Sequence, residues 1–85
     1  MRKYPQCTVN IEATQNQKIA LFTDEEIRTI LNIAEKKLEG RGRVVVRPSG
    51  TEPLIRIMVE GEDKEDTARI ADGVASRLKA RLRDY

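Results

Sequence analysis

The segment from Arg47 to Pro53, with the sequence RPSGTEP, combines residue types that bind anions. Arg47 has a planar, permanently charged guanidinium that can donate two hydrogen bonds to one phosphate group. Ser49 and Thr51 add hydroxyl donors, and Gly50 lets the backbone turn tightly and approach a ligand closely. The composition of this segment therefore predicts a phosphate-binding loop, with an ordinary Pro/Gly turn beside surface arginines as the alternative.

The backbone of the same segment also offers donors, because a concave run of amides binds anions. Free amide donors are expected on the four residues between the prolines: Ser49, Gly50, Thr51 and Glu52. The carboxylate of Glu52 would repel a phosphate, so we expect it to point away, to pair with an arginine or to lie outside the cradle. Hydrogen bonds to a charged group contribute ~1.5–3 kcal/mol each. After the costs of association, several of them predict an affinity between roughly millimolar and micromolar.

The residues that flank the loop are typical of two strands, Arg43–Arg47 and Leu54–Glu60. If the loop joins them as a hairpin and Arg47 faces Leu54, one face of the pair is apolar and should meet the helices. This register also places Arg47 and Arg56 together on the other face. Two guanidiniums on one face repel each other unless an anion lies between them. That anion is either a phosphate dianion, which makes Arg56 a further candidate contact, or the carboxylate of Glu52 or Glu60.

The first part of the chain predicts one strand and one long helix. Alternating residues predict a strand over Thr8–Ala13, followed by a polar loop over Thr14–Lys18. Residues 19–22 fit either a short strand or the approach to a helix. The helix is predicted over 23–39, with Thr23 as its N-cap, Glu26 completing a capping box and Gly40 ending it. Its apolar stripe is Ile27, Ile30, Leu31, Ala34 and Leu38.

A last helix is predicted over 64–82, with Asp63 as its N-cap. The resulting order is β-α-β-β-α. This order predicts an α+β fold in which two helices pack on one face of a small antiparallel sheet.

Composition limits the possible functions. The 85 residues indicate a single domain, and 16 basic against 14 acidic residues give a net charge of only +2. The mixed charges argue against nucleic-acid binding, and no apolar run is long enough to cross a membrane. The chain has no His and one Cys, Cys7, which excludes an internal disulfide and an ordinary zinc site. A reducing cytoplasm fits this composition best.

The loop RPSGTEP resembles the phosphate-binding loop of the α-D-phosphohexomutase superfamily. The longer stretch Arg43–Gly61, RVVVRPSGTEPLIRIMVEG, is similar to the branch of that superfamily that acts on glucosamine phosphates. Tyr4-Pro5-Gln6 before the first strand resembles the entry into the last domain of these enzymes. The resemblance covers essentially the whole chain. A branch that acts on glucose or mannose phosphates stays possible, because the loop that distinguishes the sugars does not occur here.

The resemblance implies that residues 1–85 are the fourth, C-terminal domain of a four-domain bacterial isomerase of the cytoplasm. Such enzymes interconvert glucosamine 6-phosphate and glucosamine 1-phosphate on the route to peptidoglycan precursors. A phosphoserine of the first domain transfers the phosphoryl group, and Mg²⁺ held by the second domain assists. The fourth domain is implied to hold the phosphate that is not being transferred. The residues implied to bind this phosphate are Arg47, Ser49, Gly50, Thr51 and Arg56.

Several motifs of such enzymes are absent from this sequence. It contains no Asp-Gly-Asp metal loop, no catalytic serine loop and no sugar-recognition loop. We therefore expect no catalytic residue, metal ligand or cofactor in this chain, and no mutase activity from the chain alone. The expected partners are a phosphosugar and the other domains of the same enzyme, and neither nucleic acid nor a membrane. A non-enzymatic module that binds phosphate, or that docks on a partner through its second sheet face, is the remaining alternative.

Overall fold

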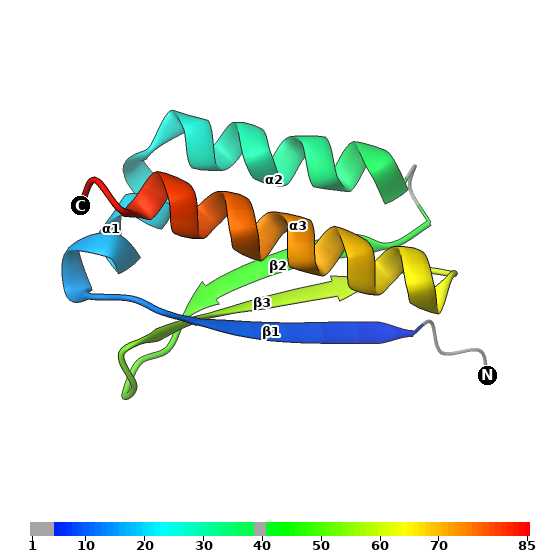
Figure 1. The fold of residues 1–85 in the computed structure, drawn as a ribbon, viewed down its shortest axis with the longest axis horizontal. Coiled ribbons are helices and arrows are strands. Elements are labelled where there is room, and N and C mark those ends of the chain that lie inside the picture. The colour runs from blue at the N-terminus through cyan, green and yellow to red at the C-terminus, as the bar shows by residue number, and fades with distance from the viewer. Residues whose placement is uncertain (1–4, 39–40) are drawn as a thin grey trace.

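The fold is built on a three-stranded antiparallel sheet. The computed structural model describes residues 5–38 and 41–85. In this part of the chain the strands are β1 (Gln6–Glu12), β2 (Arg43–Pro48) and β3 (Leu54–Glu60). β3 lies in the centre and pairs with both neighbours, so the order across the sheet is β1-β3-β2 (Figure 1). The first strand thus begins two residues earlier than predicted, and the two strands of the predicted hairpin are confirmed.

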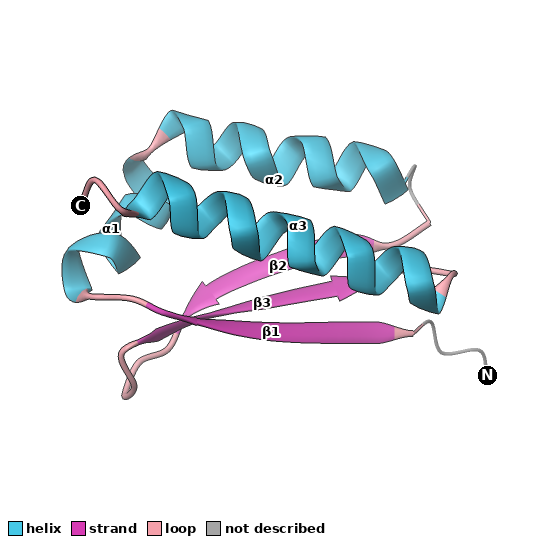
Figure 2. Cartoon of the chain, viewed as in Figure 1, coloured by secondary structure: helices cyan, strands magenta, loops and turns pink. Residues whose placement is uncertain are grey.

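Helices lie on one side of this sheet (Figure 2). They are α1 (Gln15–Thr23), α2 (Glu25–Leu38) and α3 (Lys64–Leu82). α3 packs on β1 and β3, whereas α2 packs on β2 and α3. The predicted α+β class is confirmed, but the element order is β-α-α-β-β-α because one helix was missed. None of the helices in the described ranges lies on the other face of the sheet.

The prediction for residues 14–22, a polar loop followed by a short strand or the approach to a helix, was wrong, because residues 15–23 form α1. Thr14 is its N-cap, and Thr14 Oγ1 accepts from the amide of Gln17 at 3.3 Å. The side chain of Gln17 accepts in return from the amide of Thr14 at 2.8 Å. This reciprocal capping box satisfies two donors at the start of the helix and so stabilises it. Gln17 also donates to the carbonyl of Leu82 at 2.9 Å, which fixes α1 against the end of α3.

Thr23 is not the N-cap of the second helix, as the sequence had suggested. Asp24 takes that role, because its Oδ1 accepts from the amides of Glu26 and Ile27 at 2.9 and 3.2 Å. Asp24 has extended backbone angles, which separate α1 from α2. The predicted helix over α2 is otherwise confirmed, while its expected end at Gly40 lies outside the described residues. The Asp63 cap of α3 is confirmed by bonds from the amides of Glu65 and Asp66.

The carboxylate of Asp24 also accepts hydrogen bonds from Arg81 and Tyr85, near the C-terminal end of the chain. Asp24 is buried, and its Oδ2 accepts from Arg81 Nε at 2.9 Å and from the hydroxyl of Tyr85. The bond from Tyr85, followed by that from Arg81, lowers the pKa of Asp24 to about 2. The cap of α2 therefore also connects α2 to the C-terminal end of α3.

The hairpin register differs from the predicted one by two residues. Arg47 pairs with Arg56 and Val46 pairs with Ile57, so β2 includes Pro48 and the loop is shorter than expected. A shift of two residues keeps every side chain on its face, since side chains alternate with a period of two. The predicted apolar face is therefore confirmed, although its pairs are not.

The core lies between this apolar face and the helices. Ile55, Ile57 and Val59 of the central strand are fully buried. They pack with residues of the helices and of β1, which complete the core: Ile11, Ile27, Ala34, Leu38, Ala71, Val74, Leu78 and Leu82. Each large aliphatic side chain buried in this way stabilises the fold by roughly 1.5–3 kcal/mol.

Candidate phosphate-binding site

The loop between β2 and β3 is held in shape by hydrogen bonds of its own backbone. The amide of Ser49 donates to the carbonyl of Leu54 at 2.9 Å, and the amide of Leu54 donates to the carbonyl of Glu52 at 2.8 Å. The amide of Ala13, just after β1, donates to the carbonyl of Pro53 at 2.9 Å. These bonds give residues 49–53 a defined backbone conformation at the end of the sheet, where the loop projects beyond the strands (Figure 1).

The same bonds correct the predicted set of free amides. The amide of Ser49 is used by Leu54, and the amide of Glu52 donates to Ser49 Oγ at 3.1 Å. The amides of Gly50 and Thr51 donate to no acceptor among residues 5–38 and 41–85. The loop therefore presents two backbone donors to an anion rather than four. The hydroxyl of Ser49 keeps its proton available for donation, because it only accepts from Glu52.

Arg47 and Arg56 lie directly opposite each other on the face of the sheet that no helix covers. They are cross-strand partners in the β2–β3 ladder, and both are exposed. Neither guanidinium takes part in an ion pair with another described residue. Like charges in directly opposite positions destabilise a sheet pair. The arrangement thus leaves two positive charges beside the loop without an anionic partner from the described chain.

Gly50 is exposed at the tip of the loop, and the fold itself does not require a glycine there. Its φ angle lies outside the left-handed region, and an added Cβ would meet no heavy atom within 4 Å. The backbone conformation at this position is therefore one that other residues can adopt. The open space beside Gly50 leaves room for a ligand to approach the peptide.

Thr51 and Glu52 are both exposed beside Gly50. Glu52 forms no ion pair with the arginines of the described chain, so the suggested pairing is not observed. Its backbone, in contrast, is engaged on both sides, through its amide and its carbonyl.

Lys18 of α1 is a residue of this site that sequence reasoning missed. Its Nζ donates to the carbonyl of Ser49 at 2.8 Å and to the carbonyl of Glu52 at 2.7 Å. We had assigned Lys18 to a polar loop, far from Ser49 in the sequence. The Thr14-x-x-Gln17 capping box was the available signal, because it places Lys18 in the first turns of a helix.

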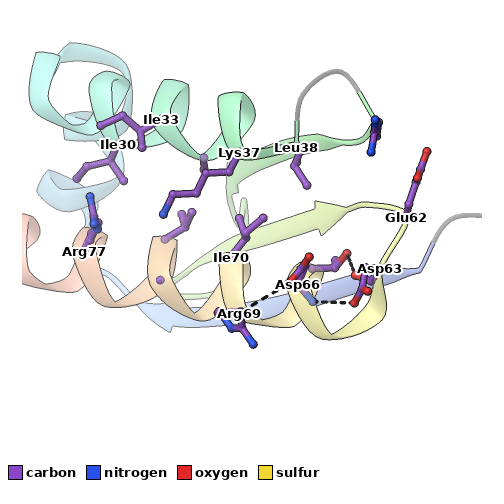
Figure 3. A pocket seen from close by; sticks show the side chains of 15 residues that line it. Ile30, Ile33, Lys37, Leu38, Glu62, Asp63, Asp66, Arg69, Ile70 and Arg77 are labelled. Atoms are coloured by element: carbon purple, nitrogen blue, oxygen red, sulfur yellow. Dashed lines mark hydrogen bonds and ion pairs between the residues drawn. The ribbon is translucent and has the colours of Figure 1, made fainter.

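A groove also lies between α2 and α3, away from the loop. Figure 3 shows Ile30, Ile33 and Ile70 in it, with Lys37 and Arg77 nearby. Acidic side chains at the start of α3 face its other end, where Asp66 pairs with Arg69 at 3.6 Å. None of the five predicted phosphate contacts lines this groove. It is therefore separate from the loop site.

The magnesium ion that the sequence resemblance implies belongs to another domain, the second. Among residues 5–38 and 41–85, no group of three His, Cys, Asp or Glu side chains is placed to hold a metal ion. Within the same part of the chain, no helix combines the length and apolar character needed to cross a bilayer.

Comparison with known proteins identifies the class to which this fold and loop belong. Residues 7–77 match the C-terminal domain of phosphoglucomutase/phosphomannomutase. This match covers most of the chain, including the whole β2–β3 hairpin and its loop. The chain belongs to this family of phosphohexomutase C-terminal domains.

Relatives with similar sequences over nearly the whole chain include phosphoglucosamine mutases. The chain is 46% identical to that of Caldicellulosiruptor saccharolyticus over 82 residues and 40% identical to that of Clostridium botulinum strain Kyoto over 83 residues. These alignments cover 96% and 98% of this chain but only 18% of each relative. The similarity thus corresponds to one domain of much longer enzymes.

Proposed function

We propose that this chain is the C-terminal phosphate-binding domain of a phosphoglucosamine mutase. In this proposal it holds the phosphate group of glucosamine 6-phosphate or glucosamine 1-phosphate that is not being transferred. The observation that carries the proposal is the pair Arg47–Arg56, directly opposite on the uncovered face beside a loop with two free amides. A phosphate dianion would accept from both guanidiniums and offset their repulsion.

Three kinds of donor would share the phosphate oxygens. Arg47 would bind in bidentate fashion, and Arg56 would bind from the adjacent strand. The amides of Gly50 and Thr51, with the hydroxyls of Ser49 and Thr51, would complete the shell. Because these donors would contact only phosphate oxygens, the same site suits either phosphate of a bisphosphorylated sugar. Glu52 would not contact the ligand.

Binding of this phosphate would position the sugar for the reaction. Energy from binding the remote phosphate would orient the reacting end of the sugar toward the catalytic groups, which belong to other domains. A small domain that closes over the sugar and opens again would allow the intermediate to reverse its orientation between the two transfers. The chain by itself would bind the sugar phosphate and would not isomerise it.

A ³¹P NMR titration of sugar phosphates with the chain tests the proposal. We expect glucosamine 6-phosphate and glucosamine 1-phosphate to bind with similar affinities in the millimolar range or tighter, and inorganic phosphate to displace both. Unphosphorylated glucosamine should displace neither. Arg47→Ala should abolish binding, whereas the matched control Arg43→Ala, at the opposite end of β2, should retain it.

The same titration has a clear contrary result. If Arg43→Ala and Arg47→Ala weaken binding equally, the phosphate is attracted by net charge and not by the loop site. If the ³¹P resonance of neither phosphosugar moves at high millimolar protein, the isolated domain does not bind phosphate and the proposal fails for the chain alone.

A further inference from the structure

We propose that Lys18 is a positioning residue of the phosphate loop, which aims the Gly50 amide at the ligand. This inference deepens the proposed function and rests on it for the identity of the ligand. Its starting point is that Lys18 Nζ donates to two loop carbonyls, those of Ser49 and Glu52, at 2.8 and 2.7 Å. These carbonyls lie 31 and 34 residues away in the sequence, so the side chain of Lys18 connects α1 to the loop.

The geometry of the peptide bond converts this contact into an orientation of the donor. The carbonyl of Ser49 and the amide of Gly50 belong to one planar trans unit, so they point in opposite directions. Because the carbonyl is held toward Lys18, the N–H of Gly50 points away from Lys18. Among the described residues this N–H has no acceptor, so it is left available to a ligand.

The charge of Lys18 also strengthens that donor. A cation bound to a carbonyl polarises the peptide unit, and a polarised unit donates more strongly through its N–H. No carboxylate of the described residues forms an ion pair with Lys18. Its positive charge thus adds to those of Arg47 and Arg56 around the loop.

The second contact fixes the other end of the loop. The carbonyl of Glu52 accepts from Lys18 and also from the amide of Leu54 at 2.8 Å. The peptide after Glu52 leads into Pro53, which has no N–H, so this contact orients no further donor. It holds the two ends of the turn together while Gly50 and Thr51 stay exposed between them.

The position of Lys18 depends on α1. Lys18 follows Gln17, whose amide and side chain form the capping box with Thr14. Gln17 is also bonded to the carbonyl of Leu82, and the neighbouring Ala20 is buried in the core. The lysine therefore extends from a helix that is fixed to the rest of the molecule, as a positioning residue requires.

Amide NMR of the ¹⁵N-labelled chain tests this inference, with Lys18→Met compared to the wild type. Without ligand, we expect the Gly50 and Thr51 amide resonances to move in the variant while the resonances of the sheet stay in place. With inorganic phosphate, we expect the affinity of the variant to fall by about ten-fold. The control Lys36→Met removes the same charge from an exposed position on α2, and it should change neither.

The outcomes separate this inference from the proposed function. If Lys18→Met lowers only the free energy of unfolding, with the Gly50 resonance and phosphate affinity unchanged, Lys18 is a structural brace and the inference fails. If the wild type binds no phosphate but the Gly50 resonance still depends on Lys18, the orienting role stands and the phosphate proposal fails. Should Lys18→Met not fold, Lys18→Gln supplies the same comparison, because its amide keeps a donor without the charge.

Discussion

Arg47 and Arg56 are placed where they reduce the stability of the sheet. They are direct cross-strand partners without an ion-pair partner among the described residues. A stable hairpin would carry opposite charges at these positions, as it does at Arg43 and Glu60 on the same face. This contrast supports the proposal that the arginine pair binds an external anion.

Arg56→Gln should therefore change stability and phosphate binding in opposite directions. Removal of one charge should raise the free energy of unfolding by about 0.2–1 kcal/mol, because the repulsion is lost. The same variant should bind phosphate more weakly. Urea denaturation and a phosphate titration measure the two effects. Arg43→Gln is the control, which should lower stability and leave binding intact. A loss of stability in Arg56→Gln would contradict the account of the site.

A substitution at Gly50 should also affect phosphate affinity without an equal effect on stability. An added Cβ meets nothing within 4 Å, so Gly50→Ala should change the free energy of unfolding by less than about 1 kcal/mol. The methyl group would occupy the space through which a phosphate approaches the backbone, and we expect the phosphate affinity to fall about ten-fold. Thermal denaturation and a phosphate titration test both parts. Unchanged affinity would show that the ligand does not come close to this peptide.

At the scale of the elements, Gly42 controls how closely the start of β2 approaches the end of β3. A Cβ at this position would clash with the carbonyl oxygen of Glu60, and backbone atoms cannot move aside as a side chain does. Gly42→Ala should therefore lower the free energy of unfolding by about 1–3 kcal/mol. The control is Gly73→Ala in α3, where a Cβ has open space and should stabilise the helix by up to about 1 kcal/mol. If urea denaturation shows that Gly42→Ala and Gly73→Ala change the free energy of unfolding equally, the backbones at the start of β2 and the end of β3 are not in close contact.

Asp24 connects two helices through its charge. Its pKa is lowered from 3.8 to about 2 in the folded chain, mainly by the bonds from Tyr85 and Arg81. A depressed pKa stabilises the fold above pH 4, and this contribution is lost as the pH falls from about 4 toward 2.

Asp24→Asn tests that linkage without removing the helix cap, since Asn caps as well as Asp. The variant should melt at a lower temperature than the wild type at pH 7. The difference between the two melting temperatures should shrink as the pH approaches 2. A difference that stays constant between pH 7 and pH 2 would contradict the charged contact with Arg81.

At the scale of the whole molecule, the sequence predicts the parts of the fold that depend on strong local patterns. The Val44–Val46 and Ile55–Val59 runs predicted the hairpin, and the apolar stripe of α3 with its Asp63 cap predicted the last helix. The face shared by Arg47 and Arg56 was also predicted, since a two-residue error in register leaves faces unchanged.

The errors have physical causes. α1 buries little, with Ala20 its only buried residue, so its apolar pattern is weak and its start depends on the Thr14 capping box. Thr23 and Asp24 are both good caps, and only the contacts of Asp24 with the distant Arg81 and Tyr85 decide between them. Lys18 could not be placed at the loop from sequence, because its two carbonyl partners are brought to it by tertiary structure.

An amide NMR titration of the labelled chain with glucosamine 6-phosphate shows directly where the phosphate of the sugar binds. We expect saturable shifts confined to the loop 49–53 and to Arg47 and Arg56, with the largest shifts at the amides of Gly50 and Thr51. Arg47→Ala should remove them. Shifts centred on the groove between α2 and α3, at Lys37 and Arg77, would contradict the account, because the phosphate would then be bound on the helical side of the molecule.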